Sequence, residues 1–402
     1  MNLKKQTLIS TLGNIINLFS LWLLTVITTR TLGYQAVGEL TLAMSVGNVF
    51  TFIQLYGVRN YQSSDITQEF STGDYIWARI ITTVIGMMLC VTFVICGGYS
   101  FSIGLSIILF TLFRTFEAVS DVFFGDIQKA GHLEFTGISL TLRGCMTVLL
   151  FLLGVREFCS LNKALMLIVG GSLFLTFTLD LYLYKRLVPL APGTIYKSLE
   201  LLKKCFPLLL AVLLPVVITT FPRIVLERYS GAELLGFYGN ISTPAVIITT
   251  IVPSILAALM PIYGELVIKK EYIGIRKLWL KTIASTGGIL ILAFLGVLIL
   301  GKQILSWIYT DAIIPYVHYL YAVLISTGLY ALTMCGASVL IALRKNAEVS
   351  TCAIAATVVC VLLTVPLVRM YGIKGAILVL IISYFFQTVL QARIIVRETG
   401  KD

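Results

Sequence analysis

Long apolar segments recur from one end of the chain to the other, and short polar stretches separate them. Each segment covers about 20 residues or more, which is the length an α-helix needs to cross the hydrocarbon core of a bilayer. A strand of a membrane barrel needs only about ten alternating residues, so the pattern predicts helices. The predicted spans are 7–29, 36–58, 75–97, 101–123, 134–155 and 161–184, then 203–226, 234–262, 279–301, 314–343, 347–368 and 373–394.

A polar stretch at residues 185–202, KRLVPLAPGTIYKSLELL, carries two prolines and separates two groups of six spans. The pattern therefore predicts an all-α polytopic membrane protein with about 12 transmembrane helices in two lobes. The predicted divisions are an N-terminal lobe at 1–187, a cytoplasmic interlobe linker at 188–202 and a C-terminal lobe at 203–402.

The two halves share a short motif, R-x-x-G-x-x-x-x-G, with an offset of 198 residues. Its residues are Arg30, Gly33 and Gly38 in the first half, and Arg228, Gly231 and Gly236 in the second. The motif follows the first span of each half, so it favours two pseudo-symmetric lobes, an arrangement common among secondary transporters. The alternative is that glycine is simply frequent in tight membrane turns.

Composition agrees with a membrane protein, because 58% of the 402 residues are hydrophobic and only 12% are charged. Soluble domains carry about twice that charged fraction. Lys4 and Lys5 precede the first apolar stretch, as in a signal peptide, but the stretch is long and lacks an A-x-A-like cleavage site. We expect a retained first helix.

Lysine and arginine lie mainly in alternate loops. With the N-terminus inside, the cytoplasmic segments hold 19 of them, or 20 with Arg79 at the start of the third span, and the outer loops hold seven. The positive-inside rule therefore predicts that both termini are cytoplasmic. The net charge of +11 is spread over short loops, which argues against nucleic-acid binding, since that needs a contiguous basic surface.

Cysteine and histidine give no sign of a metal or cofactor. The eight cysteines form no C-x-x-C pair and lie mostly in apolar spans, and His132 and His318 have no ligand-type neighbours in the sequence. We expect no disulfide framework, metal site, cofactor or catalytic residue.

Three charged residues fall where the fourth span should cross the bilayer: Arg114, Glu117 and Asp121. Their spacing of three and four places them on one helical face, and each charge costs a few kcal/mol or more in hydrocarbon. Arg143 lies near mid-depth in the fifth span, and Arg223 lies in the seventh.

Two interpretations of these charges stay open. The arginines could face a water-filled cavity that attracts an anion, with Glu117 and Asp121 as charge-coupling residues. Alternatively, Arg114 could pair with Glu117, and Arg143 with Asp121, in a closed internal network. Asp180, near the inner end of the sixth span, is interpreted as an interfacial charge.

Other spans carry polar or helix-breaking residues. Asn14 and Asn17 in the first span are candidate polar residues of a cavity. Prolines concentrate in the seventh and eighth spans, where each removes a backbone hydrogen bond and tends to kink the helix. The seventh span contains Pro207, Pro215 and Pro222, and the eighth contains Pro244, Pro253 and Pro261. These prolines predict either hinges that bend during transport or static kinks.

Four stretches together resemble the Wzx-type polysaccharide flippases of the multidrug/oligosaccharidyl-lipid/polysaccharide transporter superfamily. They are NLKKQTLISTLGNIINLFSLWLLTVITTRTLG, EAVSDVFFGDIQKAGHLEFTGISLTLRG, FPLLL with RIVLERYSGAELLGFYG, and VRMYGIKGAILVLIIS. The resemblance implies two six-helix lobes around a central cavity that alternates between the leaflets of the bacterial cytoplasmic membrane. It implies that undecaprenyl-diphosphate-linked oligosaccharide is moved to the outer leaflet, with a polysaccharide polymerase and glycosyltransferases as partners.

The resemblance also implies that a cationic lumen holds the diphosphate, and Arg114 and Arg143 fall on the matching stretch. The chain departs from many members by having Pro222 where they have an acidic residue before the arginine of the seventh span, here Arg223. A cation-coupled drug exporter of the same superfamily is the alternative, although such exporters often carry an acid where this chain has Asn14 and Asn17. A polysaccharide polymerase or ligase would need larger outer loops, so we do not expect an enzyme.

Overall fold

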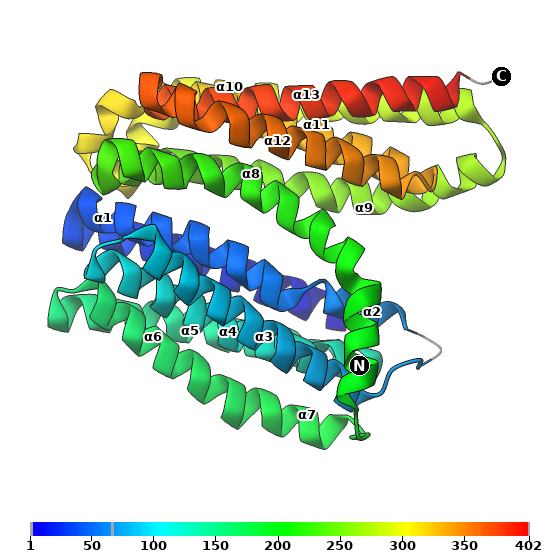
Figure 1. Ribbon diagram of the computed structural model, residues 1–402. Helices are drawn as coiled ribbons and strands as arrows, with labels where there is room; N and C mark the ends of the chain where they lie inside the picture. The colour runs from blue at the N-terminus through cyan, green and yellow to red at the C-terminus, as the bar shows by residue number, and fades with distance from the viewer. Residues whose placement is uncertain (1–2, 66–67, 401–402) are drawn as a thin grey trace. The chain divides into compact units, whose positions relative to one another are not determined.

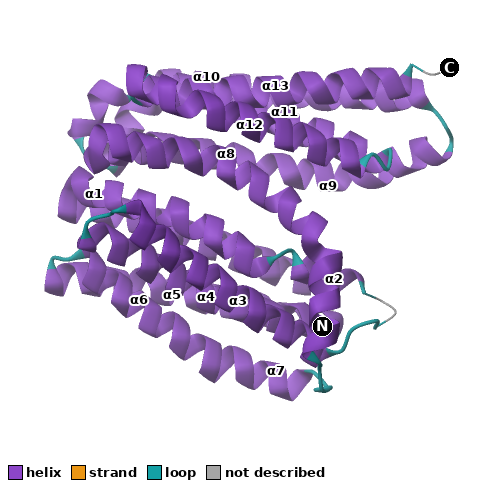
Figure 2. Ribbon diagram, viewed as in Figure 1, coloured by secondary structure: helices purple, strands orange, loops and turns teal. Residues whose placement is uncertain are grey.

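The computed structural model describes residues 3–65 and 68–400, and within them every regular element is a helix (Figures 1 and 2). The first half contains α1 (Leu3–Leu55), α2 (Val58–Ser64), α3 (Thr72–Gly97), α4 (Phe101–Lys129), α5 (Leu133–Phe158), α6 (Leu161–Leu175), a π-helical turn η1 (Thr176–Asp180) and α7 (Leu181–Leu187). The second half contains α8 (Ile195–Ser242), η2 (Thr243–Ala245), α9 (Val246–Ile268), α10 (Tyr272–Ile308), η3 (Asp311–Tyr316), α11 (Tyr319–Ala342), α12 (Asn346–Tyr371) and α13 (Ile373–Thr399).

Ten helices of the described chain are long and apolar enough to cross a membrane. Two of them, α1 and α8, are long enough for two crossings, and each is interrupted at one glycine. Gly33 has φ 84° and ψ −176°, and Gly231 has φ 84° and ψ 164°. Only glycine adopts such angles readily. The repeated sequence motif therefore marks the same backbone break in both halves, and dividing α1 and α8 there reproduces the order of the predicted spans.

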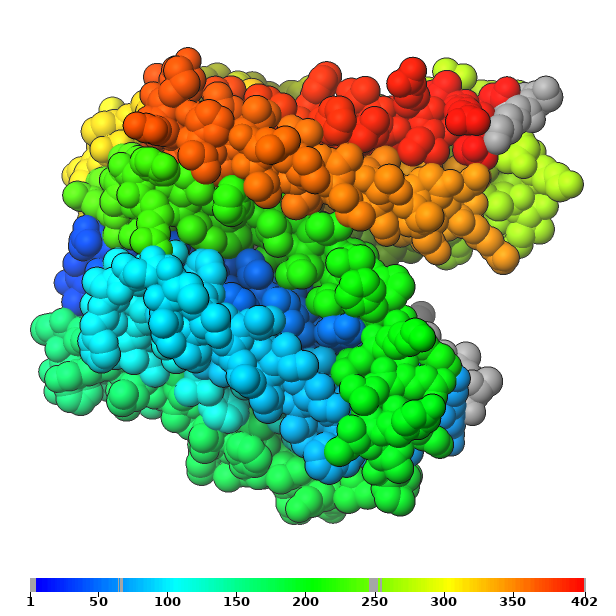
Figure 3. Space-filling model, in the orientation of Figure 1, coloured from blue at the N-terminus to red at the C-terminus, as the bar shows by residue number. Residues whose placement is uncertain are grey.

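The chain separates into two compact units, Met1–Val216 (unit 1) and Val217–Asp402 (unit 2), and the boundary falls inside α8. In unit 1, α1 packs against α3, α4 and α5, while α6 packs against α4 and α5. In unit 2, α11 packs against α9, α10 and α13, and α12 packs against α13. The space-filling view shows α12 and α13 in continuous contact along one face of unit 2 (Figure 3).

Helices α1 and α5 approach each other closely because glycines line their contact. A Cβ atom on Gly13 would lie 2.2 Å from the carbonyl oxygen of Gly137, and one on Gly137 would lie 2.4 Å from that of Ile9. Small residues allow membrane helices to pack backbone against backbone. This contact places Arg143, six residues beyond Gly137, in the interior of unit 1.

The prolines of α8 do not interrupt it. Pro207, Pro215 and Pro222 all lie within the helix, and the residue of α8 with non-helical angles is Gly231. The strong local break of this segment thus comes from a glycine, because a positive φ turns the chain more sharply than the loss of one hydrogen bond at a proline.

Candidate functional site

Arg114 and Glu117 form an ion pair one helical turn apart on α4, as one of the two sequence interpretations expects. Their side chains are 19% and 11% exposed. Arg114 Nε and Glu117 Oε1 are buried and have no hydrogen-bond partner among the described residues. The pair therefore neutralises its charges but leaves one donor and one acceptor unused, which is costly in a low-dielectric interior.

Arg143 is paired with Asp180 and not with Asp121, which corrects the second expected pairing. Arg143 Nη2 lies 2.7 Å from Asp180 Oδ2, and the two side chains are 1% and 0% exposed. The interpretation of Asp180 as an interfacial charge is also wrong. The π-helical turn ends at Asp180 and places its carboxylate in the interior, opposite the guanidinium of α5.

Hydroxyl groups from three helices surround this buried pair. Ser120 and Ser139 donate to the carboxylate of Asp180, and Arg143 donates to Ser120, Ser172 and Thr176. Each oxygen of Asp180 accepts at least one hydrogen bond, so the desolvated charges are well compensated. The network joins α4, α5 and the α6–η1 segment into one rigid core.

The sequence contains a signal for this network. Ser139 and Arg143 are four residues apart, and Ser172, Thr176 and Asp180 repeat the same spacing, so each set lies along one helical stripe. Polar stripes inside apolar helices face neighbouring helices, where their hydrogen bonds can be satisfied.

Asp121 instead binds two arginines that sequence reasoning assigned to the membrane border. Its carboxylate lies 2.9 Å from Arg59 Nη1 and 3.0 Å from Arg79 Nη2. Arg79 is 1% exposed and also donates to the backbone carbonyl of Gln54. Asp121 remains 17% exposed, so the cluster has a buried side and an accessible side.

The two asparagines of α1 differ in environment. Asn14 is exposed, whereas Asn17 is buried and its Oδ1 atom has no partner within the described part of the chain. Asn17 lies where α1 meets α5, since a Cβ on Gly144 would approach its Cα to 3.2 Å. Within the part of the chain that the structure describes, neither asparagine forms a hydrogen bond with Arg114 or Arg143.

Arg223 belongs to unit 2 and lies over an aromatic ring. Its guanidinium carbon is 5.7 Å from the centroid of Tyr238, which is 2% exposed. This geometry is a cation–π contact. Tyr330 and Tyr384 also pair in unit 2, with centroids 5.1 Å apart. The sequence indicates Arg223 as a candidate but not these tyrosines, because an aromatic residue in an apolar span does not stand out from its hydrophobic neighbours.

No group of three or more histidine, cysteine, aspartate or glutamate side chains suited to a metal ion occurs among the residues that the structure describes. The chemical groups that the site offers are guanidinium, carboxylate, hydroxyl and amide. They can bind anions and polar groups such as phosphate and sugar hydroxyls.

Comparison with solved structures defines the class of fold. The chain is similar to a multidrug resistance MATE family transporter of the MOP superfamily in an inward-facing conformation, with a TM-score of 0.77, 12% identity, and coverage of 98% of this chain and 99% of that one. It is also similar to the lipid II flippase MurJ in an inward closed conformation, with a TM-score of 0.65, 14% identity, and coverage of 96% and 87%. The fold is therefore that of MOP-superfamily transporters.

The family follows from the sequence comparison. The chain belongs to the polysaccharide biosynthesis protein family, whose model matches residues 3–267. It is 25% identical over 303 residues to the capsular polysaccharide biosynthesis protein CapF of Staphylococcus aureus, covering 74% of this chain and 75% of that protein. This confirms the resemblance seen in the sequence: the chain is a membrane protein of the polysaccharide biosynthesis family, with a fold similar to that of MATE transporters and MurJ.

Proposed function

We propose that the protein moves undecaprenyl-diphosphate-linked oligosaccharide from the inner to the outer leaflet of the bacterial cytoplasmic membrane by alternating access. Both termini are cytoplasmic in this proposal. The observation that carries it is the Arg114–Glu117 pair, a charged pair with unused hydrogen-bonding capacity inside a predicted span. Membership of the polysaccharide biosynthesis family supports a substrate used in polysaccharide synthesis.

In the proposed mechanism Arg114 contacts the diphosphate. A guanidinium binds phosphate oxygens with two parallel hydrogen bonds, and the diphosphate, with one charge on each phosphate, competes with the single carboxylate of Glu117. Release from Arg114 would free the carboxylate of Glu117, which makes Glu117 the first charge-coupling candidate. Asp121, held between two arginines, is the second coupling candidate.

Arg143 has a different role in this proposal, because Asp180 and three hydroxyls already occupy its guanidinium. It positions α4 beside α5 and the π-helical turn. Further candidates for polar contacts with the lipid-linked substrate are Arg223, Asn14 and Asn17. A polysaccharide polymerase and glycosyltransferases are the expected partners that consume and supply the substrate.

The test is translocation of a fluorescent undecaprenyl-diphosphate oligosaccharide in proteoliposomes. We compare the wild type with Arg114→Gln and Arg114→Lys, with Arg156→Gln as the control, since Arg156 is an exposed arginine at the end of α5. We expect Arg114→Gln to reduce flipping at least tenfold when equal amounts of folded, inserted protein are compared, which corresponds to about 1.4 kcal/mol. Arg114→Lys should retain part of the rate, because it keeps the charge but not the two-point grip.

The outcomes separate the alternatives. Unchanged flipping in Arg114→Gln would keep the transport function but remove Arg114 from the substrate site. No flipping of this lipid by the wild type, together with coupled efflux of cationic drugs, would overturn the proposal in favour of a drug exporter.

We further propose that α8 bends near Pro207, Pro215 and Pro222 during transport. Pro215→Ala restores one backbone N–H to a segment that is already helical, so it should not impair folding. Lost flipping with normal folding would support bending, and full activity would show that these prolines only shape a static helix.

A further inference from the structure

One end of unit 2 concentrates exposed positive charge. An apolar cluster joins α9, α10, α11 and α13 at this end, through residues that include Tyr263, Ile275, Leu340 and Ile395. Lysines and arginines surround it, and all but one are exposed: Lys269, Lys270, Arg276, Lys277, Lys281, Arg344, Lys345, Arg393 and Arg397. The other end of unit 2 carries fewer cations, with Lys302 on α10, Arg369 on α12 and Lys374 on α13.

The cations at the turn between α9 and α10 have no acidic partner. Lys345 contacts Glu348 and Glu398 at 3.6 Å and 3.4 Å. In contrast, none of the five cations between residues 269 and 281 forms an ion pair within the described chain. Glu265 and Glu271 are the acids of this segment, so it keeps a local excess of three positive charges.

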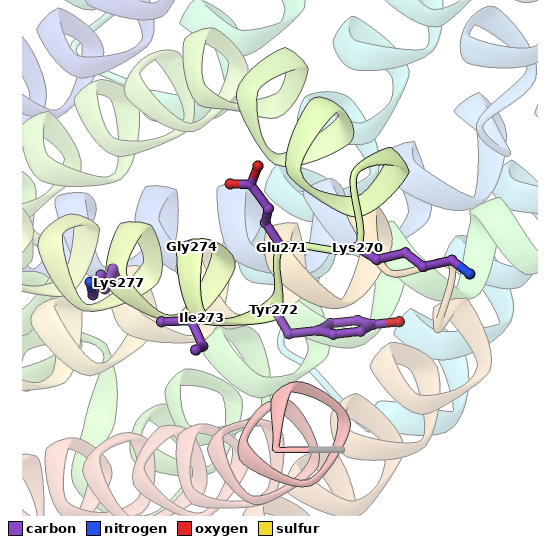
Figure 4. A pocket seen from close by; sticks show the side chains of 6 residues that line it. All are labelled: Lys270, Glu271, Tyr272, Ile273, Gly274 and Lys277. Atoms are coloured by element: carbon purple, nitrogen blue, oxygen red, sulfur yellow. The ribbon is translucent and has the colours of Figure 1, made fainter. Parts of the chain in front are cut away.

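The turn presents these charges beside apolar side chains. Ile268, Ile273 and Leu280 are 83%, 59% and 51% exposed, which places the segment at the border between hydrocarbon and water. A shallow pocket here is lined by Lys270, Tyr272, Ile273 and Lys277 among others, and Glu271 points away from Lys270 and Tyr272 (Figure 4).

The backbone of the turn adds a second feature. Lys270 has φ 58°, a left-handed conformation in which glycine is the least strained residue. Two backbone hydrogen bonds cap the end of α9: Glu271 N donates to Leu266 O at 2.9 Å, and Lys270 N donates to Val267 O at 3.1 Å. A glycine at this position would cap the helix with less strain, so the charge of Lys270 can be removed without damage to the fold.

We propose that the α9–α10 turn binds the headgroup of an anionic phospholipid. Its phosphate would bind at Lys270, and Lys277, at the other side of the pocket in Figure 4, would add to the positive potential around it. Its acyl chains would run along the exposed apolar side chains of α10. Basic residues next to a membrane helix attract anionic lipid in this way, and the short Debye length restricts the effect to cations near the surface. This site is independent of the substrate that the protein carries.

Native mass spectrometry of the full chain tests the site, with phosphatidylglycerol and phosphatidylcholine titrated in separate experiments. The variants are Lys270→Gly, the double variant Lys270→Gly/Lys277→Gln, and the control Lys302→Gln/Arg369→Gln, which removes two exposed cations from the other end of unit 2. We expect phosphatidylglycerol to bind about fivefold more weakly for each lysine removed at the turn, and the control to change by less than about twofold. Lys270→Gly should melt at or above the wild-type temperature.

Three results would overturn the proposal. Equal losses in the turn variant and the control would show that the attraction is diffuse. Equal binding of phosphatidylcholine to the wild type would show that apolar contact alone holds the lipid. Displacement of phosphatidylglycerol by millimolar glycerol 3-phosphate would identify the turn as a site for soluble phosphate.

Discussion

The interiors of the two units satisfy their polar groups in different ways. Unit 1 buries ion pairs, since Arg143 and Asp180 are almost inaccessible and Arg79 is buried against Asp121. In unit 2 the described buried contacts include pairs of hydroxyl, thiol and phenol groups, such as Tyr263 with Thr282 at 3.2 Å and Thr286 with Cys335 at 3.7 Å, besides the cation–π contact of Arg223.

This difference predicts where substitutions should lower the free energy of unfolding most. A buried charge that loses its partner keeps its full desolvation penalty, whereas a neutral group loses only one modest hydrogen bond. The ion pairs also link helices that are distant in sequence, because Arg143 on α5 joins Asp180 after α6 and Ser120 on α4. Unit 1 should therefore be the less tolerant scaffold.

The largest expected effect comes from breaking the Arg143–Asp180 pair. Arg143→Met should destabilise the protein by about 3–5 kcal/mol, because it leaves the carboxylate of Asp180 buried and uncompensated. Thermal unfolding in detergent, followed by size-exclusion chromatography, measures the loss.

The double variant Arg143→Met/Asp180→Asn is the control, since it removes both charges at once. We expect it to recover most of the lost stability, as neutral replacement of a buried pair is often well tolerated. Equal destabilisation in the single and double variants would contradict the claim that the charge, and not the packing, sets the cost.

The next effect should be the same in both units. Gly33→Ala and Gly231→Ala each force a non-glycine residue into φ 84°, and nothing lies within 4 Å of the added Cβ at either site. The cost is then backbone strain alone, about 1–3 kcal/mol, and the two melting temperatures should fall by similar amounts.

Matched controls are Gly170→Ala in unit 1 and Gly287→Ala in unit 2. Both glycines lie in helices with open space around the added Cβ, so alanine should stabilise by about 0.4–1 kcal/mol. A large loss at only one of Gly33 and Gly231 would show that the repeated motif does not serve the same purpose in both halves.

These glycines also show what could be predicted from the sequence. Hydropathy predicts the helices because burial in lipid demands about 20 apolar residues wherever a helix crosses. It misses helical extensions beyond the hydrocarbon, such as α10, which covers Tyr272–Ile308 where 279–301 was predicted. The motif spacing indicated that Gly33 and Gly231 are equivalent positions, and both have a positive φ, but it did not distinguish them from Gly38 and Gly236, which are not among the glycines with a positive φ.

Partners of buried charges were harder to predict. Asp121 and Asp180 are both acids at the inner ends of their spans, and the sequence offers no measure of which helix face meets Arg143. The choice depends on how α4, α5 and the π-helical turn pack together. The pair of Arg114 and Glu117 was one of the two interpretations open from the sequence, and it could be anticipated because the residues lie three apart on one helix.

A smaller effect is expected from a buried glutamine in each unit. Gln391 on α13 is 1% exposed, and neither atom of its amide group has a partner among the described residues. Gln391→Met keeps the size of the side chain and removes the unsatisfied groups, so it should stabilise unit 2 by about 1 kcal/mol or more.

Gln54 of unit 1 provides the comparison, because Thr115 donates to its Oε1 atom at 3.0 Å and only its Nε2 atom has no partner among the described residues. Gln54→Met loses this bond and also removes the unsatisfied Nε2, so it should stabilise less than Gln391→Met does. A higher melting temperature for Gln391→Met than for Gln54→Met would support this difference. Loss of stability in Gln391→Met would instead indicate that water or another group satisfies this amide.

The smallest expected effect concerns acid stability and lies at the loop end of unit 1. Asp65 accepts hydrogen bonds from Glu69 N at 3.0 Å, Phe70 N at 3.4 Å and Tyr75 Oη at 2.9 Å, and lies 3.8 Å from Lys129 Nζ. Burial by itself raises the pKa of Asp65, but these donors outweigh it and the pKa lies below its usual value. The folded state therefore holds this carboxyl ionised more strongly than the unfolded chain does.

A depressed pKa has a definite consequence for the pH dependence. The stabilisation is fully present above the unfolded pKa of about 3.9 and is lost as the pH falls through the folded pKa. Asp65→Asn should lower the melting temperature at pH 7, by less than about 1 kcal/mol in stability, and should flatten the decline in stability below pH 4.

The control is Lys277→Gln in unit 2. The exposed cations of the α9–α10 turn lack acidic partners, so this variant should leave the decline in stability below pH 4 unchanged. An equally steep decline in Asp65→Asn and the wild type would place the acid sensitivity elsewhere, with Glu69 as the next candidate, because Lys204 and Tyr61 lower its pKa through hydrogen bonds.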